Sequence, residues 1–117
     1  MSPIDVSICV VNYNGASVLK PCIESIAASH CKYNYEIILV DNASSDDSIA
    51  ELQATDIPLT LIQNTKNLGF AAANNQAAER AHGKYLLLLN SDTVLPQDSL
   101  EGMIDHAETV ENFGALS

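Results

Sequence analysis

The chain has 117 residues, of which 47% are hydrophobic, and its 15 acidic and 5 basic side chains give a formal net charge of −10. This length predicts a single domain over residues 1–117, and no apolar run approaches the ~18 residues of a membrane-spanning helix. The acidic balance argues against nucleic acid as a partner, because nucleic-acid-binding domains carry basic faces.

The beginning of the chain and its cysteines predict a cytoplasmic location. Residues Met1 to Asp5 lack the basic start and small-residue cleavage site of a signal peptide. Cys9, Cys22 and Cys31 are an odd number without CxxC spacing, so we expect reduced thiols. Cys9 lies in an apolar run and Cys22 on an apolar helix stripe, where small buried side chains are expected.

The first half of the chain predicts two strands with a helix between them. Val6–Val11 and Ile37–Val40 are continuous apolar runs rich in β-branched residues, typical of strands covered on both faces. Residues 18–29 predict a helix, in which Pro21 is tolerated only in the first turn. Its apolar stripe has a spacing of four: Val18, Cys22 and Ile26.

The middle of the chain predicts a short helix, a strand and a longer helix. Ser44 with Asp47 three residues later resembles a capping box, so a helix is expected to start there. Pro58–Ile62 predicts a third strand. Ala71–Ala81 is alanine-rich and predicts a helix, with Gly83 as its C-terminal stop.

The last part predicts a fourth strand, Tyr85–Leu89, and a helix after Pro96. Leu100, Ile104 and Ala107 line one face of that helix. Its other face is acidic, and we interpret it as solvated rather than as a metal site.

The resulting order βαβαβαβα predicts an α/β fold with a mostly parallel sheet and helices on both faces. Ligands of such sheets bind at the carboxyl ends of the strands. Polar residues follow each expected strand there: Asn12–Gly15, Asp41–Ser44, Gln63–Asn64 and Asn90–Asp92.

The segment Asn90–Asp92 follows the apolar run Leu86–Leu89 and supplies amide, hydroxyl and carboxylate oxygens. These donors suit a hard divalent cation, Mn²⁺ or Mg²⁺, that shares its coordination with substrate phosphates. With so few basic residues, a phosphate ligand would need such a cation to offset repulsion from nearby carboxylates. The alternative is an ordinary strand-to-helix turn, in which Asp92 caps the next helix.

Four motifs occur in order: Val11–Gly15 (VNYNG), Val40–Asp46 (VDNASSD), Asn67–Asn75 (NLGFAAANN) and Leu89–Asp92 (LNSD). Together they resemble family 2 glycosyltransferases over nearly all of the chain, and most closely a rhamnosyltransferase-like branch that builds cell-surface polysaccharides. The resemblance implies the GT-A fold, an αβα sandwich that binds nucleotide-diphospho-sugars. It also implies transfer with inversion from a metal-bound donor.

The resemblance assigns nucleotide-binding roles by motif. Tyr13 matches the residue that packs on a pyrimidine base, where stacking contributes roughly 1–3 kcal/mol, although a partly buried strand-end tyrosine is the alternative. Asp41 matches the carboxylate that accepts the NH of a uracil or thymine ring, and otherwise forms a turn or cap. The remaining nucleotide-binding matches are Asn12, Asn42, Asn67 and Gly69.

The resemblance also assigns less specific roles nearby. Asp92 and Asn90 match the metal-binding DxD signature, with Asn90 in place of its first aspartate. Lys66 could reach the phosphates, or it is a solvated loop lysine. Asn74 and Asn75 match an asparagine-containing helix of the family, or they are surface polar residues.

Family members usually extend well beyond 200 residues, and their second half carries the acceptor site and the general base. The catalytic base is therefore expected beyond Ser117, and the chain is interpreted as a truncated N-terminal donor-binding domain with little turnover by itself. Surface normally covered by a second half predicts self-association, for example as a homodimer.

The expected donor is a UDP- or dTDP-sugar, and the expected acceptor a saccharide or lipid-linked glycan. The full enzyme would then work at the inner face of the cell membrane by peripheral association. A non-catalytic nucleotide-binding or interaction module remains an alternative. A receiver-like domain needs an Asp where Gln63 and Asn64 stand, and a nucleotidyltransferase needs a Gly-rich basic loop in place of Asn12–Gly15.

Overall fold

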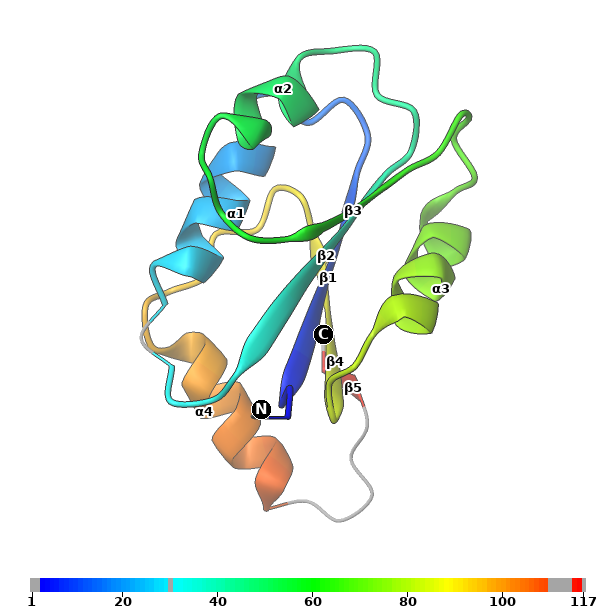
Figure 1. Cartoon of the computed structure of the whole chain (residues 1–117). Helices are drawn as coiled ribbons and strands as arrows, with labels where there is room; N and C mark the ends of the chain where they lie inside the picture. The colour runs from blue at the N-terminus through cyan, green and yellow to red at the C-terminus, as the bar shows by residue number, and fades with distance from the viewer. Residues whose placement is uncertain (1–2, 30, 110–114, 117) are drawn as a thin grey trace.

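The computed structural model describes residues 3–29, 31–109 and 115–116. Met1 and Ser2, on which part of the prediction of location rests, lie outside these ranges. The described chain forms a parallel sheet of strand order β3-β2-β1-β4-β5 (Figure 1). The strands are β1 Val6–Asn12, β2 Tyr35–Asp41, β3 Thr60–Gln63, β4 Tyr85–Asn90 and β5 Ala115–Leu116.

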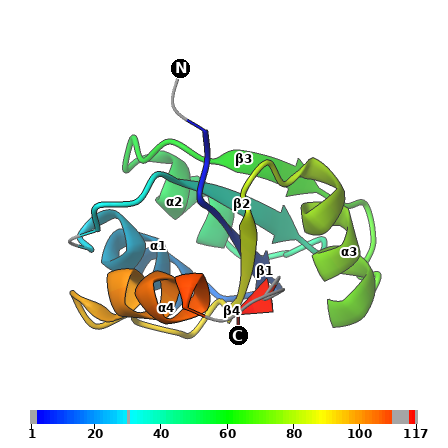
Figure 2. The same cartoon turned by 90° about the horizontal axis from the view of Figure 1, so that it is seen from below.

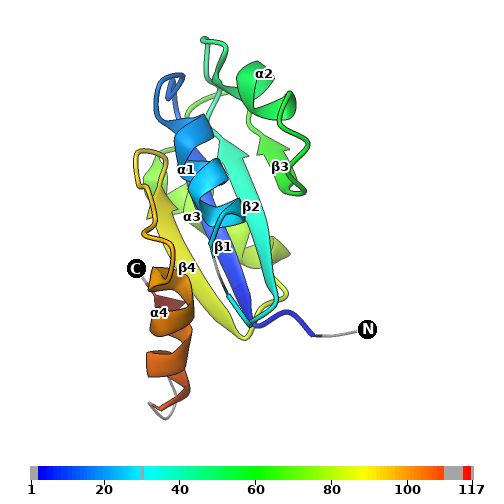
Figure 3. The same cartoon turned by 90° about the vertical axis from the view of Figure 1, so that its left-hand side faces the viewer.

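Helices cover both faces of the sheet. Three lie on one face, α1 (Leu19–Ala27), α2 (Ser48–Gln53) and α4 (Ser99–Glu108), and Figure 3 looks onto that side. The opposite face is covered by α3 (Phe70–Arg80), as Figure 2 shows. This layering confirms the α/β sandwich expected from the alternating strand and helix patterns.

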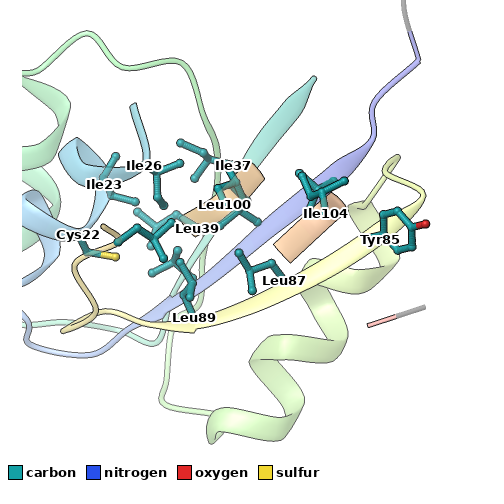
Figure 4. Close-up of a cluster of buried hydrophobic side chains, with 14 of the residues drawn as sticks. Cys22, Ile23, Ile26, Ile37, Leu39, Tyr85, Leu87, Leu89, Leu100 and Ile104 are labelled. Carbon is teal, nitrogen blue, oxygen red and sulfur yellow. The ribbon is translucent and has the colours of Figure 1, made fainter. Parts of the chain in front are cut away.

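The central strand β1 separates two apolar clusters, because alternate side chains of a strand point to opposite faces. Val6, Ile8 and Val10 pack in the larger cluster with side chains of α1 and α4. Figure 4 shows part of this cluster, with Ile23 of α1 and Ile104 of α4 among its labelled residues. Cys9 and Val11 pack on the other side against the alanines of α3. All seven residues of β1 are buried, as predicted for a strand covered on both faces.

The eight predicted elements are all present, with small differences at their ends. The third strand spans Thr60–Gln63 rather than Pro58–Ile62, and Pro21 lies in the first turn of α1 as expected. Strand β5 was not predicted, because two residues carry too short a pattern. It pairs with Leu86 and Leu87 of β4.

Two local predictions are wrong. Ser44 does not cap α2: the helix begins at Ser48, and the Ser44 hydroxyl donates to Asp41 Oδ1 instead. Gly83 is not a left-handed helix stop, because α3 ends at Arg80 and its cap residue Ala81 is extended. Gly83 is required by close approach, since a Cβ there would stand 2.5 Å from the backbone nitrogen of Ser7.

The helices of the described ranges are all too short or too polar to cross a lipid bilayer. The longest of them, α3, has 11 residues.

Candidate functional site

An open hollow of about 610 Å³ lies where β1, β2 and β4 end and α3 begins. Its lining brings together segments that are far apart in the sequence, as a ligand site at the carboxyl edge of a parallel sheet requires. Of the eight predicted binding residues, six line it: Tyr13, Asn42, Asn67, Gly69, Asn90 and Asp92.

The other two predicted residues, Asn12 and Asp41, are not part of this lining. Asn12 is fully buried and Asp41 is 4% exposed. The Asn12 amide nitrogen lies 3.0 Å from Asp41 Oδ1, 3.1 Å from Ser44 Oγ and 3.0 Å from Ser48 Oγ. Asn12 therefore joins the ends of β1 and β2 to the start of α2 from beneath the hollow.

Hydrogen bonds also interlock the loop after β1 with the loop after β2. The Asn14 amide donates to Ser44 Oγ at 2.9 Å, and Asn14 Oδ1 accepts from the Ser45 amide at 2.8 Å. Asp46 Oδ2 accepts from the Ala16 amide at 3.0 Å. Asn14 has a φ of 52°, a left-handed conformation that asparagine tolerates better than most residues. The two loops thus form one connected wall of the hollow.

The Asp46 side chain contributes to this wall as a hydrogen-bond acceptor in its charged form. Its Oδ1 accepts from both the hydroxyl and the amide of Ser48. The hydrogen bond from the Ser48 hydroxyl is the main reason why the pKa of Asp46 is lowered from its ordinary value, and the backbone donors Ser48 and Ala16 add to the effect. Asp46 is therefore held in its charged form at neutral pH.

Tyr13 stands on this wall with 53% of its surface exposed. A large aromatic ring costs free energy when exposed to water, and it offers a flat face to a planar ligand. A partly buried strand-end tyrosine is compatible with this exposure, so the binding role of Tyr13 stays a prediction.

The opposite wall is the loop that leads into α3. Gly69 has a φ of 89°, which side-chain-bearing residues rarely adopt, and its amide donates to Asn67 Oδ1 at 2.8 Å. Asn42 supports this loop, because its Nδ2 donates to the Gly69 carbonyl at 3.2 Å. Lys66 is exposed on the same loop but does not line the hollow.

The helix that follows contains the two asparagines matched by motif. Asn74 is 9% exposed, and its Oδ1 has no hydrogen-bond partner within the described residues. Asn75 is exposed on the surface of α3.

The end of β4 differs from both walls. Asn90 and Asp92 are exposed, and neither side chain has a hydrogen bond or ion pair with any residue that the structure describes. The Asn90 carbonyl accepts a long contact of 3.8 Å from the thiol of Cys22. Burial, and secondarily the charge of Asp92, raises the pKa of Cys22 to about 11.

The oxygen donors at the end of β4 fit a hard divalent cation only in part. A carboxylate, an amide and a hydroxyl belong to consecutive residues that all line the hollow. Within residues 3–29, 31–109 and 115–116, however, no three His, Cys, Asp or Glu side chains form a metal-binding group. The set therefore suits a cation that completes its coordination with ligand oxygens, as Mg²⁺ commonly does with phosphates.

The wall formed by the loops after β1 and β2, the first wall, is held by residues that were not predicted from the sequence: Asn14, Ser44, Asp46 and Ser48. Polar loop residues of these types are ordinary turn formers, so the sequence contains no signal that distinguishes a local turn from a contact between loops.

Comparison with known proteins places this geometry in a family context. The profile of the family described as Glycosyl transferase family 2 matches residues 7–114. The glucosyltransferase WfaP of Escherichia coli, described as UDP-Glc:alpha-D-GlcNAc-diphosphoundecaprenol beta-1,3-glucosyltransferase, is 32% identical over 113 residues, 96% of this chain and 45% of its own. The succinoglycan biosynthesis protein ExoO of Rhizobium meliloti is 32% identical over 97% of this chain and 34% of its own.

Solved structures share the fold. The S. aureus protein TarS, residues 1–349, in complex with UDP has a TM-score of 0.77 at 25% identity, with 90% of this chain and 33% of that one covered. The mannosyltransferase PcManGT from Pyrobaculum calidifontis, in complex with GDP-Man and Mn²⁺, has a TM-score of 0.75 at 25% identity, with 88% and 34% covered. The chain spans less than half the length of the relatives and structures named here.

Proposed function

The chain belongs to glycosyl transferase family 2, and we propose that it is the donor-binding part of a glycosyltransferase in cell-surface polysaccharide synthesis. The observation that carries this proposal is the hollow of about 610 Å³, because six predicted nucleotide and metal residues line it from four separate segments. The UDP and GDP-Man complexes of proteins with the same fold support a nucleotide-sugar as its ligand.

The first wall is proposed to bind the base. Tyr13 stacks on the ring, and the interlocked loops keep it in place before the ligand arrives, so little ordering cost falls on binding. Asp41 is proposed to accept the ring NH of uracil or thymine through Oδ2, which receives only the Ser44 amide among the described residues. Because Asp41 is 4% exposed and does not line the hollow, this contact requires the base to reach beneath the lining. A carboxylate oxygen can accept more than one hydrogen bond, so capacity remains for a ligand.

Asp92 and Asn90 are proposed to hold Mn²⁺ or Mg²⁺ together with the diphosphate. The cation would supply charge stabilisation for the departing diphosphate. Among the described lining residues, Asp92 contributes the one negative charge. The loop with Asn67 and Gly69 is proposed to bring backbone close to the phosphates. Metal and nucleotide are therefore expected to bind more tightly together than separately.

We propose transfer with inversion to a saccharide or lipid-linked acceptor. Such a transfer needs a carboxylate that accepts the proton of the acceptor hydroxyl. The only carboxylate that lines the described hollow is Asp92, which is assigned to the metal. The general base is thus proposed to come from outside the described residues, and turnover by these residues alone is expected to be low.

The donor is proposed to be a UDP- or dTDP-sugar, with dTDP-rhamnose as the form that the resemblance to rhamnosyltransferases favours. The named acceptor of WfaP, a diphosphoundecaprenol-linked sugar, supports a lipid-linked acceptor and work at the inner face of the cell membrane. Self-association of the domain stays a prediction, which sedimentation at rising protein concentration would test.

The deciding experiment is calorimetric titration with UDP, dTDP and GDP, each with and without Mn²⁺. We expect UDP or dTDP to bind more tightly than GDP, and Mn²⁺ to strengthen binding. Tyr13→Ala should weaken the binding of all three nucleotides, whereas Asp41→Asn should reduce the preference for UDP and dTDP over GDP. Failure of every nucleotide to bind would overturn the proposal and favour a non-catalytic interaction module.

A further inference from the structure

The loop from Thr65 to Phe70 is exposed at every residue, yet it forms one wall of the hollow. It connects β3 to α3 and projects from the sheet (Figure 1). Such a loop lacks apolar burial that would order it. Its position must therefore depend on a small number of hydrogen bonds.

The side-chain hydrogen bonds that reach this loop from outside, within the described residues, come from Asn42. Its Nδ2 donates to the Gly69 carbonyl at 3.2 Å, and its Oδ1 accepts from the Leu68 amide at 3.4 Å. Asn42 is 2% exposed, so its amide is fixed within the protein rather than by water. One buried amide thus holds two consecutive residues of an exposed wall.

Asn42 is in turn oriented by two further amides. Asn64 Nδ2 donates to Asn42 Oδ1 at 2.9 Å, and it also donates to Gln76 Oε1 at 2.8 Å. Gln76 Nε2 donates back to Asn64 Oδ1 at 2.8 Å. Asn64 and Gln76 therefore form a reciprocal pair, and the three side chains form an amide ladder from α3 to the end of β2.

Each amide of this ladder has a defined orientation of its oxygen and nitrogen. The Leu68 N–H and the Gly69 carbonyl fix the orientation of Asn42. Its Oδ1 also accepts from the NH₂ group of Asn64, while Asn64 Oδ1 accepts from Gln76. Asn42 therefore directs its oxygen toward Asn64 and Leu68 and its nitrogen toward the Gly69 carbonyl. A reversed Asn42 amide would set donor against donor at Leu68 and acceptor against acceptor at Gly69, and each mismatch leaves a polar group unsatisfied.

We propose that Gln76 and Asn64 are positioning residues, which set the wall at Leu68–Gly69 through Asn42 without contacting the ligand. Neither residue lines the hollow. For the ligand this inference rests on the proposed function, since the wall is the one assigned to the diphosphate. For the loop itself it stands on the hydrogen bonds alone.

The test compares Gln76→Leu with Glu79→Leu, a matched control at an exposed position of the same helix. Hydrogen exchange, measured without nucleotide, reports how strongly the amides of the wall are protected. We expect exchange at Leu68 and Gly69 to become about tenfold faster in Gln76→Leu, as loss of roughly one net hydrogen bond implies, and to stay unchanged in Glu79→Leu. Exchange in β1 should not change in either variant.

Gln76→Glu supplies a rescue arm. At neutral pH its carboxylate faces Asn64 Oδ1 without a proton, so the loop should exchange faster than in the wild type at the same pH. As the pH falls through the pKa of the new carboxyl, the added proton restores the donor, and protection should return toward the wild-type value. A loop that shows the same protection in all variants at every pH would overturn the inference.

Titration with UDP and Mn²⁺ provides the second readout. Gln76→Leu should weaken the affinity by about the same factor as it speeds loop exchange, because the ligand must then order the loop. Unchanged affinity with faster exchange would refute the role in ligand binding. If wild-type protein bound no nucleotide, the proposed function would fail, while the exchange measurements would still decide whether the ladder positions the wall.

Discussion

The two ends of the hollow are constructed differently. At the ends of β1 and β2, Asn12, Asp41 and the loop residues around Ser44 bond to one another in a mostly buried network. At the end of β4, Asn90 and Asp92 are exposed and their side chains have no partner within the described ranges. The ends of β1 and β2, the base end, are organised before binding, whereas the end of β4, the metal end, has polar side chains that face solvent and are available to a ligand.

Because of this difference, the two ends should contribute differently to the stability of the fold and to the affinity for a ligand. Side chains that bond to the protein contribute to folding, and their loss leaves buried partners unsatisfied. Side chains without protein partners contribute little to folding and can give their whole interaction to a ligand. Substitutions at the base end should therefore lower the free energy of unfolding, and substitutions at the metal end should not.

Asn12→Leu, at the base end, should give the largest loss of stability. The change removes the amide that bonds to Asp41, Ser44 and Ser48, and it leaves a buried carboxylate short of one donor. We expect the free energy of unfolding in urea to fall by about 2–3 kcal/mol. Asn75→Leu, at an exposed position of α3, should change it by no more than about 0.5 kcal/mol. Equal losses in the two variants would contradict the prediction.

Gly15→Ala should give the next largest loss. A Cβ at Gly15 would collide with the side-chain oxygen of the fully buried Asn12, so the loop must shift at a cost of about 1–3 kcal/mol. Gly102 in α4 is the matched control, because a Cβ there meets no atom within 4 Å. Gly102→Ala should raise the free energy of unfolding by about 0.4–1 kcal/mol. The two alanines must have opposite effects in thermal or urea unfolding.

Asp46 predicts a smaller effect that depends on pH. Since its pKa in the folded protein lies below the ordinary 3.8, its hydrogen bonds stabilise the protein at neutral pH and are lost as the pH falls below that value. Asp46→Asn lacks this titration, so the stability difference from the wild type should stay constant near neutral pH and shrink as the pH falls below 3.8. Urea unfolding at a series of pH values measures it, and a difference that stays constant below pH 3.8 would exclude the carboxylate as its source.

Asp92→Ala should have the smallest effect on folding, within about 0.5 kcal/mol of the wild type. The same variant should lose the strengthening of nucleotide binding by Mn²⁺, because it lacks the single carboxylate among the described lining residues. Calorimetry with and without the metal, beside urea unfolding, measures both. A clear loss of stability would show that Asp92 has a structural role and would remove the difference between the two ends.

The order of elements and the edge of the sheet where the hollow lies could be predicted from the sequence. Continuous apolar runs such as Val6–Val11 gave the buried strands, and the polar residues after them gave the carboxyl edge where the hollow lies. Alternation of strands and helices implied a parallel sheet. Each of these signals is local in the sequence, or repeats along it.

The contacts between loops could not be predicted. Asn14 and Ser45 are 31 residues apart, and Asn42 and Asn64 are 22 apart. Their pairing depends on the register of parallel strands, which composition does not encode. Ser44 illustrates the problem, since its spacing to Asp47 satisfies a helix-cap pattern while its hydroxyl bonds to Asp41. Gly83 likewise resembled a helix stop, and only the packing against Ser7 explains it.

The central position of β1 has a consequence for folding of the protein during its synthesis on the ribosome. One edge of β1 pairs with β2, but the other edge stays unpaired until β4 has been synthesised. Tyr85 of β4 lies 79 residues after its partner Val6. At roughly 5–20 residues per second, synthesis of that interval takes about 4–16 s. For that time the nascent chain exposes an apolar strand edge, which a chaperone or another nascent chain could occupy.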